Sequence, residues 1–254
     1  MKNKMPLLFV GHGSPMNIID DNSFTRTLYS LGKTLQPKSI LVISAHWVID
    51  KTKVVSVEKP KTIHDFYGFP DELYQIQYPA PGALQLAKEL AKVAEPTGEW
   101  GLDHGSWAVL RLMFPEANVP VTQMSLNRIM TLQQHFELGR ELRRLREQGV
   151  LIVGSGNLVH NLREIIWRTE APAFDWAVEF DAIVEKELSA RRWDRLIDLT
   201  AFNERQFRRA HPSIEHYLPL LPILGAADAD ESLTYPTAVI QNGSIAMRTV
   251  LIGA

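Results

Sequence analysis

Short, continuously apolar segments alternate with amphipathic segments along most of the chain. The apolar segments are residues 6–10 (PLLFV), 39–47 (SILVISAHW), 119–126 (VPVTQMSL) and 150–157 (VLIVGSGN), which have the pattern of strands covered on both faces. Residues 22–35, 81–96, 106–115, 131–149 and 174–190 carry apolar side chains at helical spacing, and 52–58 alternate like a half-exposed strand. Parallel strands need such crossovers, so we expect an α/β fold with a largely parallel or mixed central sheet and helices on both faces.

Turn residues add further detail to this prediction. We expect one helix to run from Pro81 to Pro96, another to stop at Gly149, and a helix begun near His211 to be interrupted by Pro219. Asn-Gly lies between apolar runs in residues 238–252, which predicts a C-terminal β-hairpin. The sequence has no internal repeat and no linker, so residues 1–254 are expected to form a single catalytic domain.

Composition and charge exclude several classes of protein. The 27 basic and 29 acidic residues give a net charge of −2, which argues against a nucleic-acid or membrane-surface partner. The chain has no cysteine, so thiolate catalysis and Cys-based metal sites are excluded. The apolar stretch of residues 217–227 is broken by Pro219 and Pro222, and the N-terminal apolar run is too short for a signal peptide. We therefore expect a cytoplasmic protein without a membrane span.

Three of the predicted strands lead directly to a histidine. The first is followed by His12 between two glycines, the second ends in His46, and the strand of residues 150–157 leads through Ser155 and Asn157 to His160. Ligands of open α/β sheets bind beyond the carboxyl ends of the strands, so these histidines are predicted at one edge of the sheet. Each alone is more often a cap or turn residue, but together they indicate a site for a divalent metal ion.

The other histidines each allow a structural and a functional interpretation. His104 precedes a predicted helix, where it is either a turn residue before an N-cap at Ser106 or a group that orients substrate. His64 and Asp65 are either a self-satisfied surface pair or a lid contact. His135 lies in an amphipathic helix and is interpreted as structural. The segment with His211, Glu215 and His216 is a candidate source of a further metal ligand.

The ordered motifs of this chain resemble one enzyme family. These motifs are GHGSP, SAHW, TIHDF, YPAPG, LDHGSW, GSGNLVHNL and HPSIEHYLPL, and the resemblance extends from about residue 7 to Gly243-Ser244. They occur in the same order in the DOPA-dioxygenase-type, LigB-like (class III) extradiol ring-cleaving dioxygenases. The resemblance implies a single α/β domain with a non-haem Fe(II) centre, in which Zn(II) often occupies the site as purified.

The resemblance also implies roles for individual residues. His12, His46 and His216 match the metal ligands, with Glu215 as an alternative to His216 because the wider superfamily uses a glutamate there. His160 matches the catalytic acid–base histidine and is also a possible additional metal contact. His104 matches a second active-site histidine near substrate and oxygen.

The expected function is an oxidoreductase that uses O₂ to open the ring of a catechol such as DOPA, with cleavage at the 4,5 position, to give a muconic semialdehyde. The partners are then a small-molecule catechol and O₂, and nothing in the sequence indicates an oligomeric state. The alternative is a zinc-dependent hydrolase that uses the same histidines, although the sequence around Ser155 lacks the G-x-S-x-G pattern. A third possibility is a metal-binding or regulatory domain in which protein ligands occupy every coordination position of the ion, so that none is open to a substrate.

Overall fold

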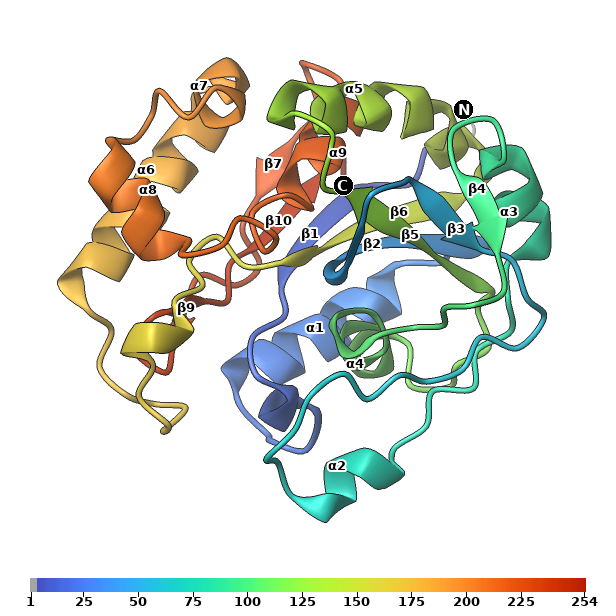
Figure 1. Ribbon diagram of the computed structural model, residues 1–254, viewed down its shortest axis with the longest axis horizontal. Coiled ribbons are helices and arrows are strands. Elements are labelled where there is room, and N and C mark those ends of the chain that lie inside the picture. Colours follow the sequence, from blue (N-terminus) through green and yellow to red (C-terminus); the bar gives the residue numbers. More distant parts are fainter. Residues whose placement is uncertain (1–3) are drawn as a thin grey trace.

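The computed structural model describes residues 4–254 and has an α/β architecture built on a mixed sheet (Figure 1). Its eight strands follow the order β4-β3-β5-β2-β6-β1-β10-β7. They are β1 (Leu7–Gly11), β2 (Ser39–Ile49), β3 (Lys53–Val55), β4 (Glu95–Thr97), β5 (Val121–Asn127), β6 (Val150–Gly156), β7 (Leu233–Thr234) and β10 (Thr249–Ile252). A separate antiparallel pair consists of β8 (Ile240–Gln241) and β9 (Ile245–Ala246).

The centre of the sheet is parallel and its margins are mixed. β5, β2, β6 and β1 pair in parallel, whereas β10 joins β1 and β3 joins β5 in the antiparallel sense. The four parallel strands are the continuously apolar segments of the sequence, as expected for strands with both faces covered. Their carboxyl ends therefore meet at one edge of the sheet.

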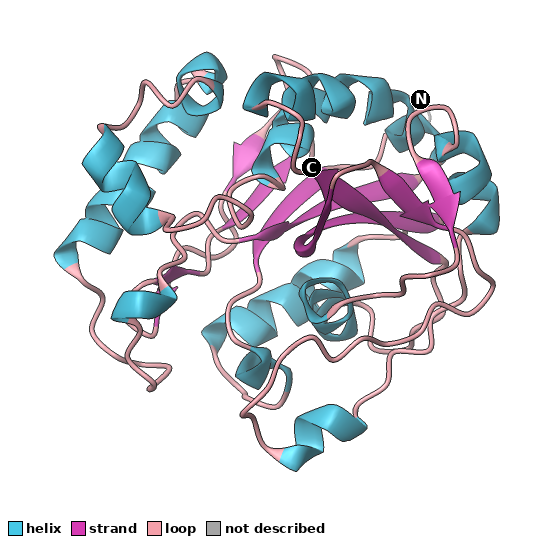
Figure 2. Cartoon of the chain, in the orientation of Figure 1, coloured by secondary structure: helices cyan, strands magenta, loops and turns pink. Residues whose placement is uncertain are grey.

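Helices cover both faces of the sheet (Figure 2). The helices are α1 (Ser23–Thr34), α2 (Asp71–Gln75), α3 (Leu84–Leu90), α4 (His104–Met113), α5 (Leu132–Leu142), α6 (Asp175–Ser189), α7 (Trp193–Ile197), α8 (Glu204–Ala210) and α9 (Leu220–Ala226). Three 3-10 helices are η1 (Pro15–Ile18), η2 (Arg143–Gln148) and η3 (Leu162–Glu164). Figure 1 shows α1 and α4 on one face and α5 and α9 on the other, with α6, α7 and α8 beside the sheet. Each face has its own buried apolar cluster.

The predicted fold class is confirmed, and several boundaries differ. The C-terminal hairpin forms at Asn242-Gly243, whose positive φ angles of 54° and 76° give the left-handed turn that this dipeptide favours. The residues after it do not extend the hairpin: β10 crosses to pair with β1. The helix predicted for residues 131–149 ends as α5 at Leu142, and η2 continues it to Gly149, which has a φ of 89°.

Two proline-based predictions were wrong. Helix α3 ends at Leu90, and Pro96 lies in strand β4 at the edge of the sheet, where a missing N–H donor costs no ladder bond. Pro219 does not interrupt a helix but is the N-cap of α9, because the fixed φ of proline suits the start of a helix. His211 ends α8 instead of beginning a helix. Among residues 4–254, no helix has the length and apolar character needed to cross a bilayer.

Candidate active site

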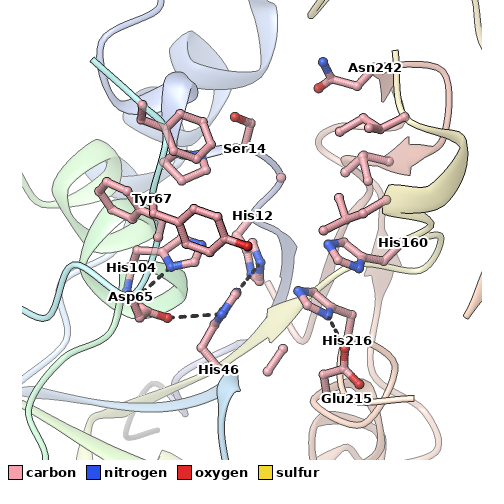
Figure 3. A pocket seen from close by; sticks show the side chains of 18 of the residues that line it. His12, Ser14, His46, Asp65, Tyr67, His104, His160, Glu215, His216 and Asn242 are labelled. Atoms are coloured by element: carbon pink, nitrogen blue, oxygen red, sulfur yellow. Dashed lines mark hydrogen bonds and ion pairs between the residues drawn. The ribbon is translucent and has the colours of Figure 1, made fainter. Parts of the chain in front are cut away.

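Five histidines from separate segments converge at the carboxyl edge of the parallel strands. His12 follows β1, His46 lies in β2, and His104 is the first residue of α4. His160 comes from the loop after β6, and His216 from the turn before α9. All five line one cavity (Figure 3).

The glycines around His12 have a structural reason. Gly13 has a φ of 62°, a left-handed conformation that glycine adopts without strain, so the chain turns sharply after the histidine. A Cβ on Gly11 would collide with the backbone of Ala246 and Met247, so only glycine allows β1 to approach the C-terminal hairpin this closely. The close approach at Gly11 and the sharp turn at Gly13 together place His12 at the wall of the cavity.

The rings of His12, His46 and His216 form a nearly regular triangle. Their centroids are 5.0, 5.2 and 5.1 Å apart. Three imidazoles that bind one ion through nitrogens about 2 Å from it, at angles near tetrahedral, have ring centres about 5 Å apart. The triangle is therefore of the size that a single metal ion requires.

The outer nitrogen of each ring in this triangle is held by an acceptor. The Ser155 hydroxyl donates to the Gly105 carbonyl oxygen at 2.5 Å, so its oxygen accepts from Nδ1–H of His12 at 2.9 Å. Asp65 and Glu215 supply carboxylate oxygens to the Nδ1 atoms of His46 and His216, at 3.1 and 3.3 Å. With Nδ1 protonated in each ring, the three Nε2 lone pairs are available to a metal.

The Nε2 atoms of the three rings have no acceptor or donor besides one another among the described residues. Nε2 of His216 is buried and has no hydrogen bond among the described residues. The Nε2 atoms of His12 and His46 are 3.1 Å apart, and two lone pairs at that distance require a proton or a cation between them. The donor set contains only imidazole nitrogens, which suit iron, zinc, copper and nickel. The residues present therefore fit a transition-metal ion.

His104 and His160 lie beside this triangle. The nearest donor atoms of His12, His46 and His104 fall within 4.8 Å of one another, as do those of His160, Glu215 and His216. The ring of His104, however, is only 4.0 Å from that of His46, closer than two ligands spread around one ion. His160 stacks flat on His216 at 3.4 Å with an interplanar angle of 7°, so the two rings do not face a common centre. The ring geometry thus favours a position next to the ion for both, whereas the donor-atom distances group His104, and not His216, with His12 and His46.

Asp65 is the site residue that sequence reasoning missed. Its carboxylate lies 3.1 Å from Nδ1 of His46 and 3.0 Å from Nδ1 of His104, and it accepts the backbone N–H of His104 at 2.8 Å. Of the two interpretations of His64 and Asp65, the self-satisfied surface pair was wrong, because Nε2 of His64 instead bonds to the Ile76 carbonyl at 2.9 Å. The only signal in the sequence was an acidic residue inside the TIHDF motif.

Electrostatics in the cluster follow from burial and from Asp65. Burial, with the neighbouring histidines, lowers the pKa of both His12 and His216 well below its ordinary value. Burial also acts to lower the pKa of His46, but the hydrogen bond to Asp65 and nearby carboxylates outweigh it and raise that pKa. Burial alone would raise the pKa of Asp65, whereas hydrogen bonds from His104 and His46 hold it far below its usual range. Asp65 is thus an ionised acceptor between two imidazoles.

The remaining predictions for this region have mixed outcomes. The N-cap of α4 is Asp103, which accepts from the Ser106 N–H at 3.1 Å, so a cap at Ser106 was wrong. His211 does not reach the site: its Nε2 bonds to the Leu158 carbonyl at 2.9 Å and it is absent from the cavity wall. Ser155 is fully buried and hydrogen-bonded to His12, so its hydroxyl is not an accessible nucleophile. His135 is buried within α5, away from the cavity.

The cavity has a volume of about 870 Å³. Its buried floor carries the histidines, and its walls carry mostly apolar and aromatic side chains, among them Phe66, Tyr67, Phe69, Ile165 and Trp167. Figure 3 shows Tyr67 and Ser14 above the histidine cluster and Asn242 on the opposite wall. Such a site can hold an aromatic ring against a metal ion and restrict the access of water.

Comparison with known proteins identifies the family of the chain. Residues 7–245 match the family model described as the catalytic LigB subunit of aromatic ring-opening dioxygenase. The chain is 42% identical over 261 residues to a protein of Escherichia coli K12 named 4,5-DOPA dioxygenase extradiol, with 98% of this chain and 95% of the relative covered. A protein of Beta vulgaris with the same name is 36% identical, with 86% and 85% covered.

A solved structure shares the whole fold. The crystal structure of an uncharacterised protein from Escherichia coli K12 superposes with a TM-score of 0.85 at 39% identity, covering 98% of this chain and 100% of that one. The family implies an organic small-molecule substrate and O₂ as partners. The chain belongs to the LigB family of extradiol, aromatic ring-opening dioxygenases.

Proposed function

We propose that this enzyme is a metal-dependent dioxygenase that inserts both atoms of O₂ into the ring of a DOPA-like catechol. Cleavage falls at the 4,5 position, next to the hydroxyl pair and not between its carbons, and the product is a muconic semialdehyde. Residues 1–254 act as one catalytic domain. The observation that carries the proposal is the triangle of the His12, His46 and His216 rings on the cavity floor, whose centroids are 5.0 to 5.2 Å apart.

His12, His46 and His216 hold the ion in this proposal, which is Fe(II) in the active enzyme, while Zn(II) can occupy the site as isolated. Ferrous iron supplies the one-electron chemistry that couples a catechol to O₂, whereas Zn²⁺ has no redox chemistry. These three residues would hold the ion and leave it accessible to a substrate from the cavity. Asp65, Ser155 and Glu215 fix the ring orientations through the Nδ1 atoms.

Two histidines beside the ligand triangle are assigned the proton transfers. Burial, followed by the charges of neighbouring histidines, lowers the pKa of His160 to about 3, so its ring is neutral and can accept a proton from a catechol hydroxyl. Burial, followed by the charge of His46, lowers the pKa of His104, although the Asp65 carboxylate 3.0 Å from its Nδ1 acts to raise it. His104 is assigned the return of a proton to the oxygen that comes from O₂, because its ring lies 4.0 Å from that of His46, beside the ligand triangle.

One experiment separates this proposal from the zinc-hydrolase alternative. The protein is loaded with Fe(II) under nitrogen, mixed with DOPA, and then exposed to O₂, with a Zn(II)-loaded sample as the matched control. The proposal predicts O₂ uptake equal to the amount of a new visible-absorbing semialdehyde, in the Fe(II) sample alone. Cleavage of an ester or amide by the Zn(II) sample under nitrogen, without O₂ uptake by either sample, would support a hydrolase instead.

A further inference from the structure

The cavity is larger than a bare catechol ring requires. Its volume of about 870 Å³ lies in the ~300–1,000 Å³ range of sites for drug-sized ligands. Its rim includes Tyr67 and Trp167, whose side chains are 92% and 76% exposed. Exposed large aromatic side chains beside a cavity are typical of binding surfaces. A substrate that fills this space carries a substituent from the floor towards the rim.

The rim also contains a cation without a counter-ion. Arg163 is the single Lys or Arg among the described residues that line the cavity. Within residues 4–254, no carboxylate oxygen approaches its guanidinium to within 4.0 Å. The adjacent acid, Glu164, is instead bound by Arg209 through two contacts of 2.9 and 2.7 Å. The charge of Arg163 is therefore available to a ligand.

The acidic groups of the cavity do not oppose an anion at this position. Asp65 is engaged by His46 and His104 at 3.1 and 3.0 Å. Glu215 is engaged by His216 and by the Ser213 hydroxyl, which donates to it at 2.8 Å. Each carboxylate that lines the cavity thus already has donors, whereas the arginine has no partner of opposite charge.

The backbone that carries Arg163 is held in place. Asn161 accepts the Arg163 N–H through Oδ1 at 2.9 Å and donates through Nδ2 to the Arg209 carbonyl at 2.8 Å. The Ser244 hydroxyl in turn donates to the Asn161 carbonyl at 2.9 Å. Arg163 follows His160 by three residues, so the catalytic loop and the cation share one segment.

We propose that Arg163 binds the carboxylate of the substrate side chain, so that the substrates of this enzyme are catechols with an anionic tail. The guanidinium group matches a carboxylate with two parallel N–H···O bonds, a geometry that selects acids over neutral or cationic analogues. The inference rests on the proposed function, because it places the catechol end at the histidines and the acid end at the rim.

The test measures binding apart from turnover. Calorimetry under nitrogen compares 3,4-dihydroxyphenylpropanoate with 4-methylcatechol on the Fe(II)-loaded protein, for the wild type, Arg163→Gln and Arg168→Gln. Arg168 is an exposed arginine five residues along the same loop that does not line the cavity, so it is the matched control. Arg163→Gln should weaken the acid about tenfold, equivalent to about 1.4 kcal/mol, and change 4-methylcatechol less than about twofold. Arg168→Gln should change neither.

The outcomes are distinguishable. Equal weakening of both ligands by Arg163→Gln, or no weakening of the acid, would overturn the role of Arg163. Wild-type binding that prefers the acid, without O₂ uptake on either ligand, would refute the proposed function and leave the carboxylate site standing. A charge reversal adds a gain of function: Arg163→Glu should shift the preference of the enzyme from the acid towards dopamine, measured as the ratio of their kcat/KM values.

Discussion

Replacement of Asp65 by asparagine tests whether this carboxylate orients the neighbouring histidines and so raises the affinity of the site for a metal ion. The Asp65 carboxylate lies 3.1 Å from Nδ1 of His46 and 3.0 Å from Nδ1 of His104, and it accepts the backbone N–H of His104 at 2.8 Å. An asparagine keeps one acceptor oxygen and turns an NH₂ group towards one of the rings, so one imidazole loses its acceptor. The substitution also removes the negative charge that, against the effect of burial, raises the pKa of His46.

The magnitude follows from two independent estimates. A hydrogen bond to a charged group contributes about 1.5–3 kcal/mol when it is buried. Loss of a residue that orients a metal-binding histidine costs about 10- to 100-fold in metal affinity, which is about 1.4–2.7 kcal/mol. The two ranges agree, so Asp65→Asn should raise the metal dissociation constant by about 10- to 100-fold.

The assay is competition for Zn(II) or Fe(II) against a chelator of known affinity, with chemical denaturation as a second measurement. Asp71→Asn is the matched control, because Asp71 is an exposed aspartate of the same connecting region, in the first turn of α2. Wild-type metal affinity in a folded Asp65→Asn variant would refute the reasoning. A loss of stability with unchanged affinity would show that Asp65 serves the fold and not the ion.

Three further predictions concern the proton-transfer residues, the ligand set and a distant ion pair. His216→Ala should lose the metal, measured by elemental analysis, whereas His104→Ala should retain it and lose turnover; the reverse result would exchange their roles. His160→Ala should keep the metal and lose about 100-fold in kcat, and unchanged kcat would exclude it as the base. Burial acts to raise the pKa of Glu231, but hydrogen bonds from Arg146 outweigh it and hold that pKa at about 2. The contribution of Glu231 to the free energy of unfolding should be complete above the ordinary pKa of 4.5 and be lost as the pH falls towards 2. Urea titrations at several pH values should show a weaker dependence of that free energy on pH for Glu231→Gln than for the wild type.

Local sequence patterns predicted much of the fold because the determining interactions are local. The parallel strands are buried on both faces and so read as continuous apolar runs, and their carboxyl ends locate His12 and His46. Asn242-Gly243 specifies its own turn through the two positive φ angles. The same reasoning failed at Pro96 and Pro219, where a short edge strand and a helix start depend on tertiary context.

The rest of the site depends on contacts that periodicity does not encode. Asp65 lies in a long connection without regular structure between β3 and α2, and its alignment with His46 and His104 comes from the packing of that loop against α4. The antiparallel return of β10 to β1 likewise joins segments at opposite ends of the chain. Ser155 was noticed as a possible nucleophile, and only its hydrogen bond to His12 gives it a supporting role.

The central claim is that three imidazoles bind one ion. Anomalous X-ray diffraction from crystals loaded with Fe(II) under nitrogen tests it most directly. The account predicts one strong peak about 2 Å from Nε2 of His12, His46 and His216. A peak bound by His104 or Glu215 in place of His216, or no peak within reach of His12 and His46 together, would contradict it.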